Sequence, residues 1–215
     1  MQPTFIQQIQ ERLNQALPGM KAQSLMMGAR FREKESNAYA KASADARQAA
    51  VMVLLFEKEG KWYTNLMQRP ESNYAHSKQV SLPGGGLEEE DANLEACATR
   101  ETEEEFGIPR ADIQVLGALS ALYIPVSNYL VQPFVGYLNA APSYTRDPNE
   151  VEEILEVALE DLMDPALRKV TTIDTSSGFT LKDIPYFDVV GKTVWGATAM
   201  MLSEFVYLLE EFQEN

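Results

Sequence analysis

The sequence is poor in cysteine, in basic residues and in long apolar runs. Cys97 is its one cysteine, so no disulfide can form within the chain, as is typical of proteins from a reducing compartment. No stretch approaches the roughly 20 apolar residues of a membrane span, and the first residues lack the basic-then-apolar pattern of a secretory signal. These absences predict a cytoplasmic protein without a membrane segment.

The charge balance limits the class of partner. Lysines and arginines number 18 against 32 aspartates and glutamates, which gives a net charge of −14 at pH 7. A nucleic-acid polymer is therefore not expected as a partner, because such binding depends on basic groups that neutralise phosphates. A small phosphorylated ligand is compatible if cations bridge it to acidic side chains. Solubility alone explains most of the excess acid, so only acids in a special arrangement point to a site.

The apolar pattern predicts one α/β domain with elaborations. Helical spacing is found over residues 5–17, 91–106 and 197–212. Strand patterns are found over residues 49–56, 62–68, 115–123, 129–138 and 151–159, with shorter ones near 170 and 186–189. Strands mixed with a few helices, one of them inside the strand order, predict an α/β sandwich. We expect residues 47–215 to form the domain, and residues 1–46, a helix and an irregular segment, to pack on it.

The helix predicted over residues 91–106 carries an unusual acidic face. Gly107 stands just past its end, where a C-terminal glycine belongs. At roughly 100° per residue, Glu101, Glu104 and Glu105 fall on one face. The apolar positions Leu94, Cys97 and Ala98 fall on the same face. A solvated acidic face would lie opposite the apolar stripe, whereas these carboxylates extend it.

This cluster predicts a metal site. At about 6 Å and an effective dielectric constant of 20, each pair of carboxylates repels by roughly 3 kcal/mol, a cost that bound divalent cations would reverse. Oxygen ligands of this kind suit Mg²⁺ or Mn²⁺. The alternative is that the acids pair with Arg or Lys. The preceding Gly84-Gly85-Gly86 favours the cation, because glycines allow close approach and offer carbonyls and amides to a metal or phosphate. Arg100 and Glu103 fall away from this face of the helix.

The stretch from Gly85 to Ile108 resembles the Nudix box, G-x5-E-x7-R-E-U-x-E-E-x-G-U, in which U is a bulky apolar residue. Its core R-E-x-x-E-E-x-G is intact. Two departures occur: Thr102 stands at the first U after Arg-Glu, and the earlier glutamate falls at Ala92, directly after Glu90-Asp91. The resemblance implies a Nudix-type α/β/α sandwich with a mixed central sheet and the catalytic helix after a glycine-rich loop. It also implies metal-dependent hydrolysis of a pyrophosphate bond in a small nucleotide-containing substrate.

The resemblance assigns metal ligands by position. Glu101, Glu104 and Glu105 would be the metal-binding carboxylates, Glu105 belonging to the catalytic set as well. The carbonyl of Gly84 is a further candidate ligand. Arg100 would act in catalysis by orienting the cluster through a salt bridge.

A general base is also needed, and several Nudix members supply a glutamate from a later loop. Glu150 and Glu153 are the candidates here, and the alternative for either is a solvated strand end.

Three parts of the sequence outside the box are similar to coenzyme A pyrophosphatases: Leu66–Pro70 with His76–Gly85, then Ile124–Tyr129 with Pro133–Gly136 and Asn149–Val151, and finally Val194–Ala199. The likeness covers roughly residues 47 to 210, and such enzymes cleave coenzyme A or its thioesters to 3′,5′-ADP and 4′-phosphopantetheine. The pattern has glycine, phenylalanine and arginine where this sequence has Lys78, Leu82 and Tyr74. The assignment of the substrate therefore rests on fewer matching residues than the assignment of the reaction.

Arg69 and Lys78, together with Gly85 and Gly86, are the candidate substrate-binding residues. The two cations could meet substrate phosphates, with an ordinary surface charge as the alternative for each. Other hypotheses are hydrolysis of ADP-ribose or a dinucleotide, and a non-catalytic nucleotide sensor, against which the intact carboxylate set argues. Met26-Met27 and the first helix could form a partner surface, although their docking on the domain itself is the expected arrangement. A homodimer is possible.

Overall fold

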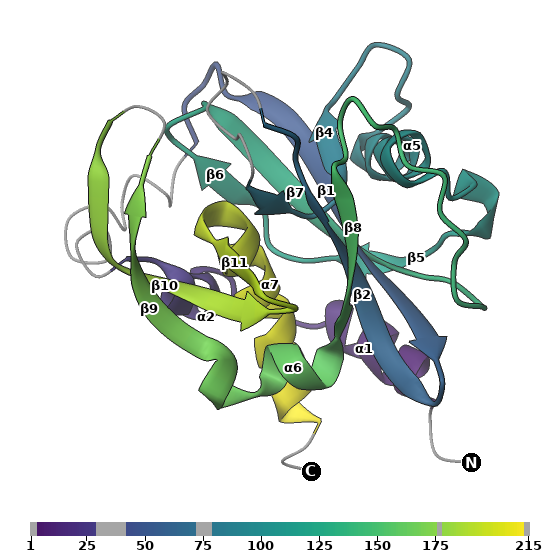
Figure 1. Cartoon of the computed structure of the whole chain (residues 1–215). Coiled ribbons are helices and arrows are strands. Elements are labelled where there is room, and N and C mark those ends of the chain that lie inside the picture. The colour runs from purple at the N-terminus through teal and green to yellow at the C-terminus, as the bar shows by residue number, and fades with distance from the viewer. Residues whose placement is uncertain (1–3, 29–41, 72–78, 176–177, 213–215) are drawn as a thin grey trace.

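A computed structural model describes residues 4–28, 42–71, 79–175 and 178–212 (Figure 1). Its helices are α1 (Phe5–Leu13), α2 (Met20–Gln23), α5 (Leu94–Phe106), α6 (Leu159–Met163) and α7 (Gly196–Glu211), with 3-10 turns η1 (Ser24–Met26), η2 (Arg110–Asp112) and η3 (Pro165–Leu167). Its strands are β1 (Arg47–Lys58), β2 (Lys61–Gln68), β3 (Val80–Ser81), β4 (Gly84–Gly86), β5 (Gln114–Ala118), β6 (Leu122–Ile124), β7 (Tyr129–Tyr137), β8 (Glu153–Ala158), β9 (Arg168–Asp174), β10 (Thr180–Val189) and β11 (Lys192–Trp195). The predicted α/β class is confirmed.

The main sheet has eight strands and is mixed, as expected. Its path runs β3-β2-β1-β7-β5, while β8 pairs with β2, β4 with β1 and β6 with β7. Strands β1 and β7 are parallel, and the other described pairs in this sheet are antiparallel. Strands β1 and β2 form a hairpin that turns at Glu59-Gly60, whose φ angles of 54° and 76° fit the tight turns that match strand twist.

The glycine-rich segment before α5 forms the short strand β4. It pairs with β1 at Ala49–Val51. Gly84 has a φ of 150°, and a Cβ on it would lie 2.3 Å from the Ala50 carbonyl oxygen. Only glycine allows this approach. The chain is thereby pressed onto the central strand directly before the acidic helix begins.

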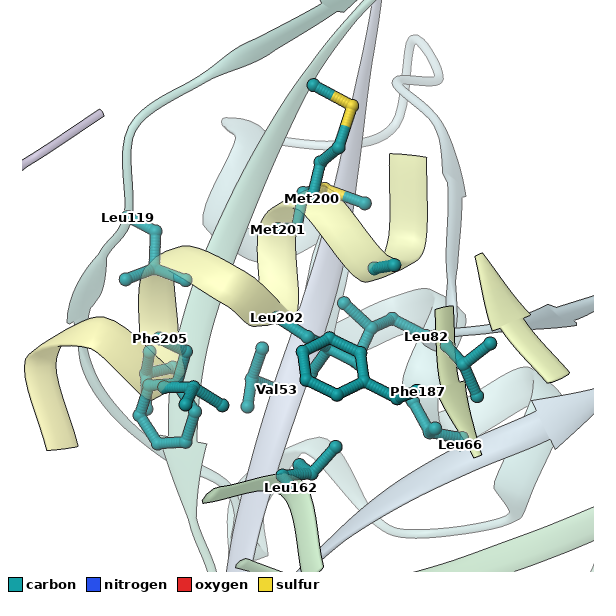
Figure 2. Close-up of a cluster of buried hydrophobic side chains, with 14 of the residues drawn as sticks. Val53, Leu66, Leu82, Leu119, Leu162, Phe187, Met200, Met201, Leu202 and Phe205 are labelled. Atoms are coloured by element: carbon teal, nitrogen blue, oxygen red, sulfur yellow. The ribbon is translucent and has the colours of Figure 1, made fainter. Parts of the chain in front are cut away.

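Strand β1 is buried on both faces, which explains its continuous apolar run. One face carries Ala50, Met52, Leu54 and Phe56, which pack with Cys97, Ala98 and Phe106 of α5. The other face carries Ala49, Val53 and Leu55, which belong to a larger cluster with α1 and α7. Figure 2 shows this larger cluster, with Val53 of β1 and Leu66 of β2 beside residues of α7. The sheet is therefore covered by helices on both sides.

The second sheet, in the order β11-β10-β9, joins the core on the α7 side. Phe187 of β10 and Val194 of β11 are buried in the larger cluster, as are Met26 and Met27 from the N-terminal segment. The N-terminal helices and the small sheet thus share one apolar core with the main sheet.

A buried carboxylate ties the N-terminal segment to α7. Glu204 is fully buried. Its Oε1 accepts a hydrogen bond from the Gly19 backbone N–H at 2.8 Å, and its Oε2 accepts from the Gln23 side-chain amide at 2.9 Å and the Ser120 N–H at 3.1 Å. Three donors therefore surround one buried acid.

Several predicted element bounds were wrong. The first helix ends at Leu13 rather than at residue 17, and the single strand predicted over 115–123 is divided into β5 and β6. Residues 119–121 separate the two strands, and β5 itself shifts register against β7 between Val115 and Gly117. Helix α2 lies in the segment predicted to be irregular, because four residues are too few to produce a helical repeat.

Candidate active site

Helix α5 is fixed at both ends by local signals. The Asn93 side chain caps its start by accepting from the Ala96 N–H at 2.8 Å. Gly107 ends it with a φ of 70°, which confirms the predicted C-terminal glycine. The helix begins at Leu94, later than predicted, because Asp91 is used in the preceding loop, where its Oδ2 accepts from the Glu88 N–H at 2.9 Å.

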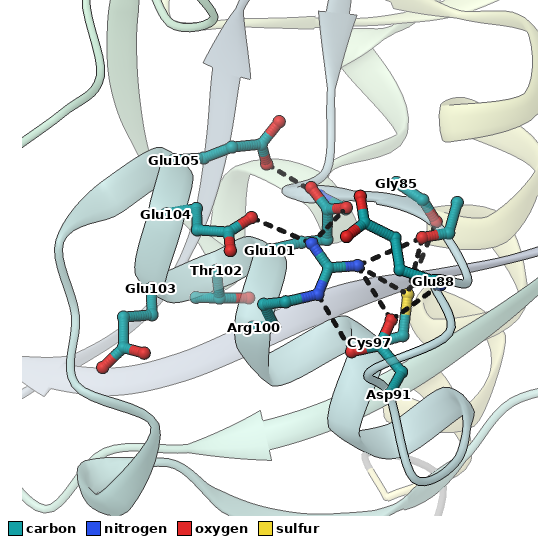
Figure 3. Close-up of polar contacts among 12 residues, drawn as sticks. Gly85, Glu88, Asp91, Cys97, Arg100, Glu101, Thr102, Glu103, Glu104 and Glu105 are labelled. Atoms are coloured by element: carbon teal, nitrogen blue, oxygen red, sulfur yellow. Dashed lines mark hydrogen bonds and ion pairs between the residues drawn. The ribbon is translucent and has the colours of Figure 1, made fainter.

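Arg100 lies at the centre of an ion-pair network (Figure 3). Its Nη1 donates at 2.9 Å to both Glu101 Oε1 and Glu104 Oε2. Its Nε and Nη2 each donate to one oxygen of Asp91, both at 2.9 Å. Helical spacing placed this side chain away from the core, which was wrong: the loop before α5 folds back over Arg100 and buries it. The salt bridge that the resemblance implied is present.

Asp91 takes the place of the earlier box glutamate. The box pattern counts that position to Ala92, but the carboxylate that reaches Arg100 comes from Asp91, one residue earlier. The hydrogen bonds from Arg100 lower the pKa of Asp91 to about 2, so this acid is charged at any physiological pH. An arginine held on both sides by carboxylates has little freedom to move.

Glu105 is the most buried acid of α5. Its side chain is 1% exposed, and its Oε2 accepts the Gly84 N–H at 2.8 Å. The other oxygen faces Arg69 Nη2 at 3.4 Å. Burial, assisted by the charges of Glu101 and Glu150, raises the pKa of Glu105 to about 8 although Arg69 and the Gly84 N–H act against it. Any further positive charge nearby would stabilise the ionised form of this carboxylate.

Glu101 is packed directly against β4. A Cβ on Gly85 would lie 2.3 Å from Glu101 Oε1, so the carboxylate occupies the space that any other residue at 85 would fill. Burial raises the pKa of Glu101, against Arg100, and the charges of Glu104 and Glu150 raise it further. Glu101 and Glu105 therefore flank the glycine strand from one helix face.

Glu104 was predicted on the inward face, and this was wrong. Its side chain is 54% exposed, because the buried face of α5 is centred on Ala98, Thr102 and Glu105, further round the helix than the spacing suggested. Glu104 instead stands at the rim, held by Arg100. Glu103 points away from the cluster, as predicted, and pairs with Arg110 at 2.5 Å.

The two base candidates occupy different surroundings. Glu150 is exposed in the turn before β8, and its charge acts on both Glu101 and Glu105. Glu153 begins β8 and pairs with Lys192 of β11 at 2.6 Å. The structure therefore brings Glu150 to the cluster and ties Glu153 to the second sheet. Nothing in the sequence pattern connected Lys192 with this region.

The predicted substrate-binding residues are only partly described. Arg69 follows β2 and its Nη2 also lies 3.4 Å from the Gly84 carbonyl oxygen. The Gly86 carbonyl accepts from Arg100 Nη2 at 3.1 Å. Lys78 lies outside the described residues, as do His76 and Tyr74.

The donor set fits a hard divalent cation in its chemistry. It consists of carboxylate and carbonyl oxygens, which Mg²⁺ and Mn²⁺ prefer. Neighbouring carboxylates raise the pKa of Glu101 and that of Glu105, and a cation beside these two acids would offset that repulsion. Within the described part of the chain, no three Asp, Glu, His or Cys side chains are already placed to hold a metal ion.

Comparison with known proteins establishes the family. A family model described as the NUDIX domain matches residues 46–174. The chain belongs to the Nudix family. This Nudix hydrolase is 33% identical over 162 residues to a protein of Photorhabdus laumondii described as an uncharacterized Nudix hydrolase NudL, covering 75% of this chain and 84% of the relative. It is also 33% identical over 165 residues to Nudix hydrolase 22, chloroplastic, of Arabidopsis thaliana, covering 73% of this chain and 53% of that protein.

Solved structures show the same fold. A MutT/nudix family protein of Enterococcus faecalis aligns with a TM-score of 0.51 at 14% identity, covering 100% of this chain and 76% of that one. The MutT protein of Methanosarcina mazei aligns with a TM-score of 0.51 at 16% identity, covering 79% of this chain and 99% of that one. Hydrolases of this family generally use divalent metal ions and act on small nucleotide substrates. In the described segments, no helix has the length and apolarity to cross a bilayer.

Proposed function

We propose that this Nudix hydrolase cleaves the pyrophosphate bond of coenzyme A or its thioesters, using Mg²⁺ or Mn²⁺, and releases 3′,5′-ADP and the phosphopantetheine portion. The observation that carries the proposal is the pair of buried carboxylates, Glu101 and Glu105, set against the glycine strand β4. The sequence likeness to coenzyme A pyrophosphatases on both sides of the box supports the choice of substrate.

The charge of Glu105 is only partly compensated within the chain. Its Oε2 accepts the Gly84 N–H at 2.8 Å, and its Oε1 accepts a longer hydrogen bond from Arg69 Nη2 at 3.4 Å. Burial outweighs both contacts and raises the pKa of Glu105, so a further cation beside it would be favourable. Glu101, Glu104, Glu105 and the Gly84 carbonyl are the groups that would hold a divalent cation. A cation bound there supplies neutralisation of the pyrophosphate charge.

Three further side chains have separate roles in the proposed reaction. Arg100 holds Glu101 and Glu104 in place. Arg69, partly exposed beside Glu105, is available to a substrate phosphate. Hydrolysis joins a water oxygen to one phosphorus and breaks the bridging P–O bond, and Glu150 would accept the proton that the water loses.

The first test is a panel of nucleotides incubated with pure protein and Mg²⁺ or Mn²⁺: coenzyme A, an acyl-coenzyme A, ADP-ribose and a dinucleotide. We expect 3′,5′-ADP from the first two at the highest kcat/KM. A preference for ADP-ribose or the dinucleotide would overturn the substrate assignment. Nucleotide binding without any product would indicate a sensor.

The second test addresses the carboxylates. We expect Glu105→Gln and Glu104→Gln to lower kcat by at least about 100-fold while the protein stays folded, because interactions of this kind in the transition state are worth several kcal/mol. Glu103→Gln is the matched control on the same helix, since Glu103 pairs with Arg110 outside the cluster. Unchanged activity of Glu105→Gln would refute its assignment.

We also propose the domain division that the sequence predicts. Residues 47–215 would form the hydrolase domain and residues 1–46 a segment packed on it. The cytoplasmic location stays a prediction. Met26 and Met27 pack into the core of the domain, which is the expected docking rather than a partner surface. The homodimer stays a prediction, and light scattering would measure the assembly state directly.

A further inference from the structure

The loop between β7 and β8 is docked on the C-terminal end of α5. The Thr145 N–H donates to the Phe106 carbonyl at 2.9 Å, and the Asp147 N–H donates to the Glu105 carbonyl at 3.2 Å. Thr145 also packs on Gly107, where a Cβ would lie 2.6 Å from the Thr145 carbonyl oxygen. The backbone of this loop is thus fixed to the residue that carries the most buried carboxylate.

Asp147 organises the next turn of the same loop. Its Oδ1 accepts from the Asn149 backbone N–H at 2.8 Å and from the Asn149 side-chain amide at 2.9 Å. Its carbonyl accepts from the Glu150 N–H at 3.2 Å and the Val151 N–H at 2.8 Å. A side chain that binds the backbone two residues on closes an Asx turn. Asp147 therefore links Glu105 on one side to Glu150 on the other.

The turn determines where Glu150 lies. Glu150 is exposed, yet its charge acts on Glu101 and Glu105. Its backbone N–H is held by the Asp147 carbonyl, and the next N–H along the chain, that of Val151, is held by the same oxygen. The location of Glu150 relative to the cluster is therefore set by the hydrogen bonds that converge on Asp147.

We propose that Asp147 is a positioning residue, whose side chain closes the turn that presents Glu150 to the carboxylate cluster of α5. This inference rests on the proposed function, in which Glu150 accepts the proton from water. Asp147 acts through Glu150 and does not touch the substrate. A residue that only stabilised the loop would alter the melting temperature without a selective effect on kcat.

The experiment compares Asp147→Ala with Asp147→Asn. Asparagine keeps the oxygen that accepts from Asn149, whereas alanine removes it. We expect Asp147→Ala to lower kcat about tenfold with KM within about twofold, since one such hydrogen bond shifts a local population by roughly that factor, and Asp147→Asn to stay within about twofold of the wild type. Equal loss in both variants, or a change confined to KM, would overturn the proposal.

Asp164→Ala is the matched control. Asp164 Oδ1 accepts from the Ala166 N–H at 2.8 Å, in the same i to i+2 arrangement, between α6 and β9. It should show any general effect of losing an Asx turn, including a lower melting temperature, while kcat is unchanged. A comparable fall in kcat for Asp164→Ala would show that the loss at Asp147 is not specific.

A double-mutant cycle with Glu150→Gln separates the possible failures. If Asp147 acts through Glu150, then Asp147→Ala adds no further loss of kcat in the Glu150→Gln background. Additive losses would overturn the proposal. A wild-type protein that hydrolyses no nucleotide would instead refute the proposed function, and full activity of Glu150→Gln would refute the base assignment while leaving pyrophosphate cleavage intact.

Discussion

Gly85 and Gly86 are neighbours in β4 with different local environments. Gly85 lies under the Glu101 carboxylate, whereas a Cβ on Gly86 would meet nothing nearer than the Tyr129 hydroxyl at 3.7 Å, an ordinary contact. Neither has a left-handed φ. An alanine at Gly85 would therefore fill the space of the Glu101 carboxylate, and an alanine at Gly86 would not. Neither substitution requires a backbone conformation that alanine disfavours.

We expect Gly85→Ala to weaken Mn²⁺ binding at least about tenfold, because displacement of a ligand or its support typically costs that much. The protein should still fold, since the crowded group is the end of a flexible side chain. Gly86→Ala should bind Mn²⁺ within about twofold of the wild type. Isothermal titration calorimetry without substrate measures both, and equal affinities for the two variants would contradict a role of Glu101 in holding the cation.

At the scale of single residues, spacing alone predicted part of this site. It placed Glu101 and Glu105 on one buried face and Glu103 outside it, because helical periodicity decides both. It could not predict that Arg100 is buried, since the covering group is a loop that lies outside the helix. The sequence offered Glu90 and Asp91 as nearby acids without deciding between them, and it is the Asp91 carboxylate that reaches Arg100.

At the scale of elements, the important contact is between the end of α5 and the loop from β7 to β8. Gly107 makes it possible, because its left-handed φ turns the chain and its missing side chain admits Thr145. The sequence predicted the glycine that ends the helix, because that signal is local. It could not predict the contact with Thr145, because the two residues are almost forty positions apart and no periodic pattern connects them.

Gly107→Ala should therefore cost more stability than its φ alone explains. Gly191, in the β10–β11 turn, has nearly the same φ as Gly107, 72° against 70°. A Cβ on Gly191 would meet no atom within 4 Å, whereas a Cβ on Gly107 would clash with Thr145. We expect Gly191→Ala to lower the free energy of unfolding by about 1 kcal/mol and Gly107→Ala by about 3 kcal/mol. Urea unfolding checks both, and equal losses would show that the Thr145 contact is unimportant.

At the scale of the whole molecule, the main sheet separates two hydrophobic clusters that support different parts of the structure. The cluster on the α5 side supports the carboxylates, and the larger one on the α7 side joins the N-terminal helices and the second sheet to the body. The α/β class was predictable because β1, β2 and β7 follow strand patterns while α5 and α7 follow helical spacing. The order of the strands, and the small sheet with β11, depend on long-range pairing that the sequence pattern does not record.

Glu204 should be the most sensitive acid outside the site. Its replacement by alanine leaves the donors of Gly19, Gln23 and Ser120 without their acceptor in a buried position. We expect Glu204→Ala to lower the free energy of unfolding by about 3 kcal/mol or more. Glu210 lies on the same helix as Glu204 and forms a partly exposed ion pair with Arg168 of β9. Glu210→Ala should lower the free energy of unfolding by at most about 1 kcal/mol. Urea unfolding compares them, and similar losses would refute the importance of the buried acid.

The position of Glu204 in the chain has a consequence for how the protein is made. Its partners Gly19 and Gln23 leave the ribosome early, while α7 is among the last elements to emerge, and synthesis proceeds at roughly 5–20 residues per second. At that rate about ten seconds pass between the emergence of Met26 and that of α7, and until then Ile9, Leu13 and Met26 can be covered only by earlier elements such as β5, which lies against Leu13. The nascent chain therefore passes through an interval in which its N-terminal helices are partly open to chaperones or to neighbouring chains, and that interval closes when α7 has folded.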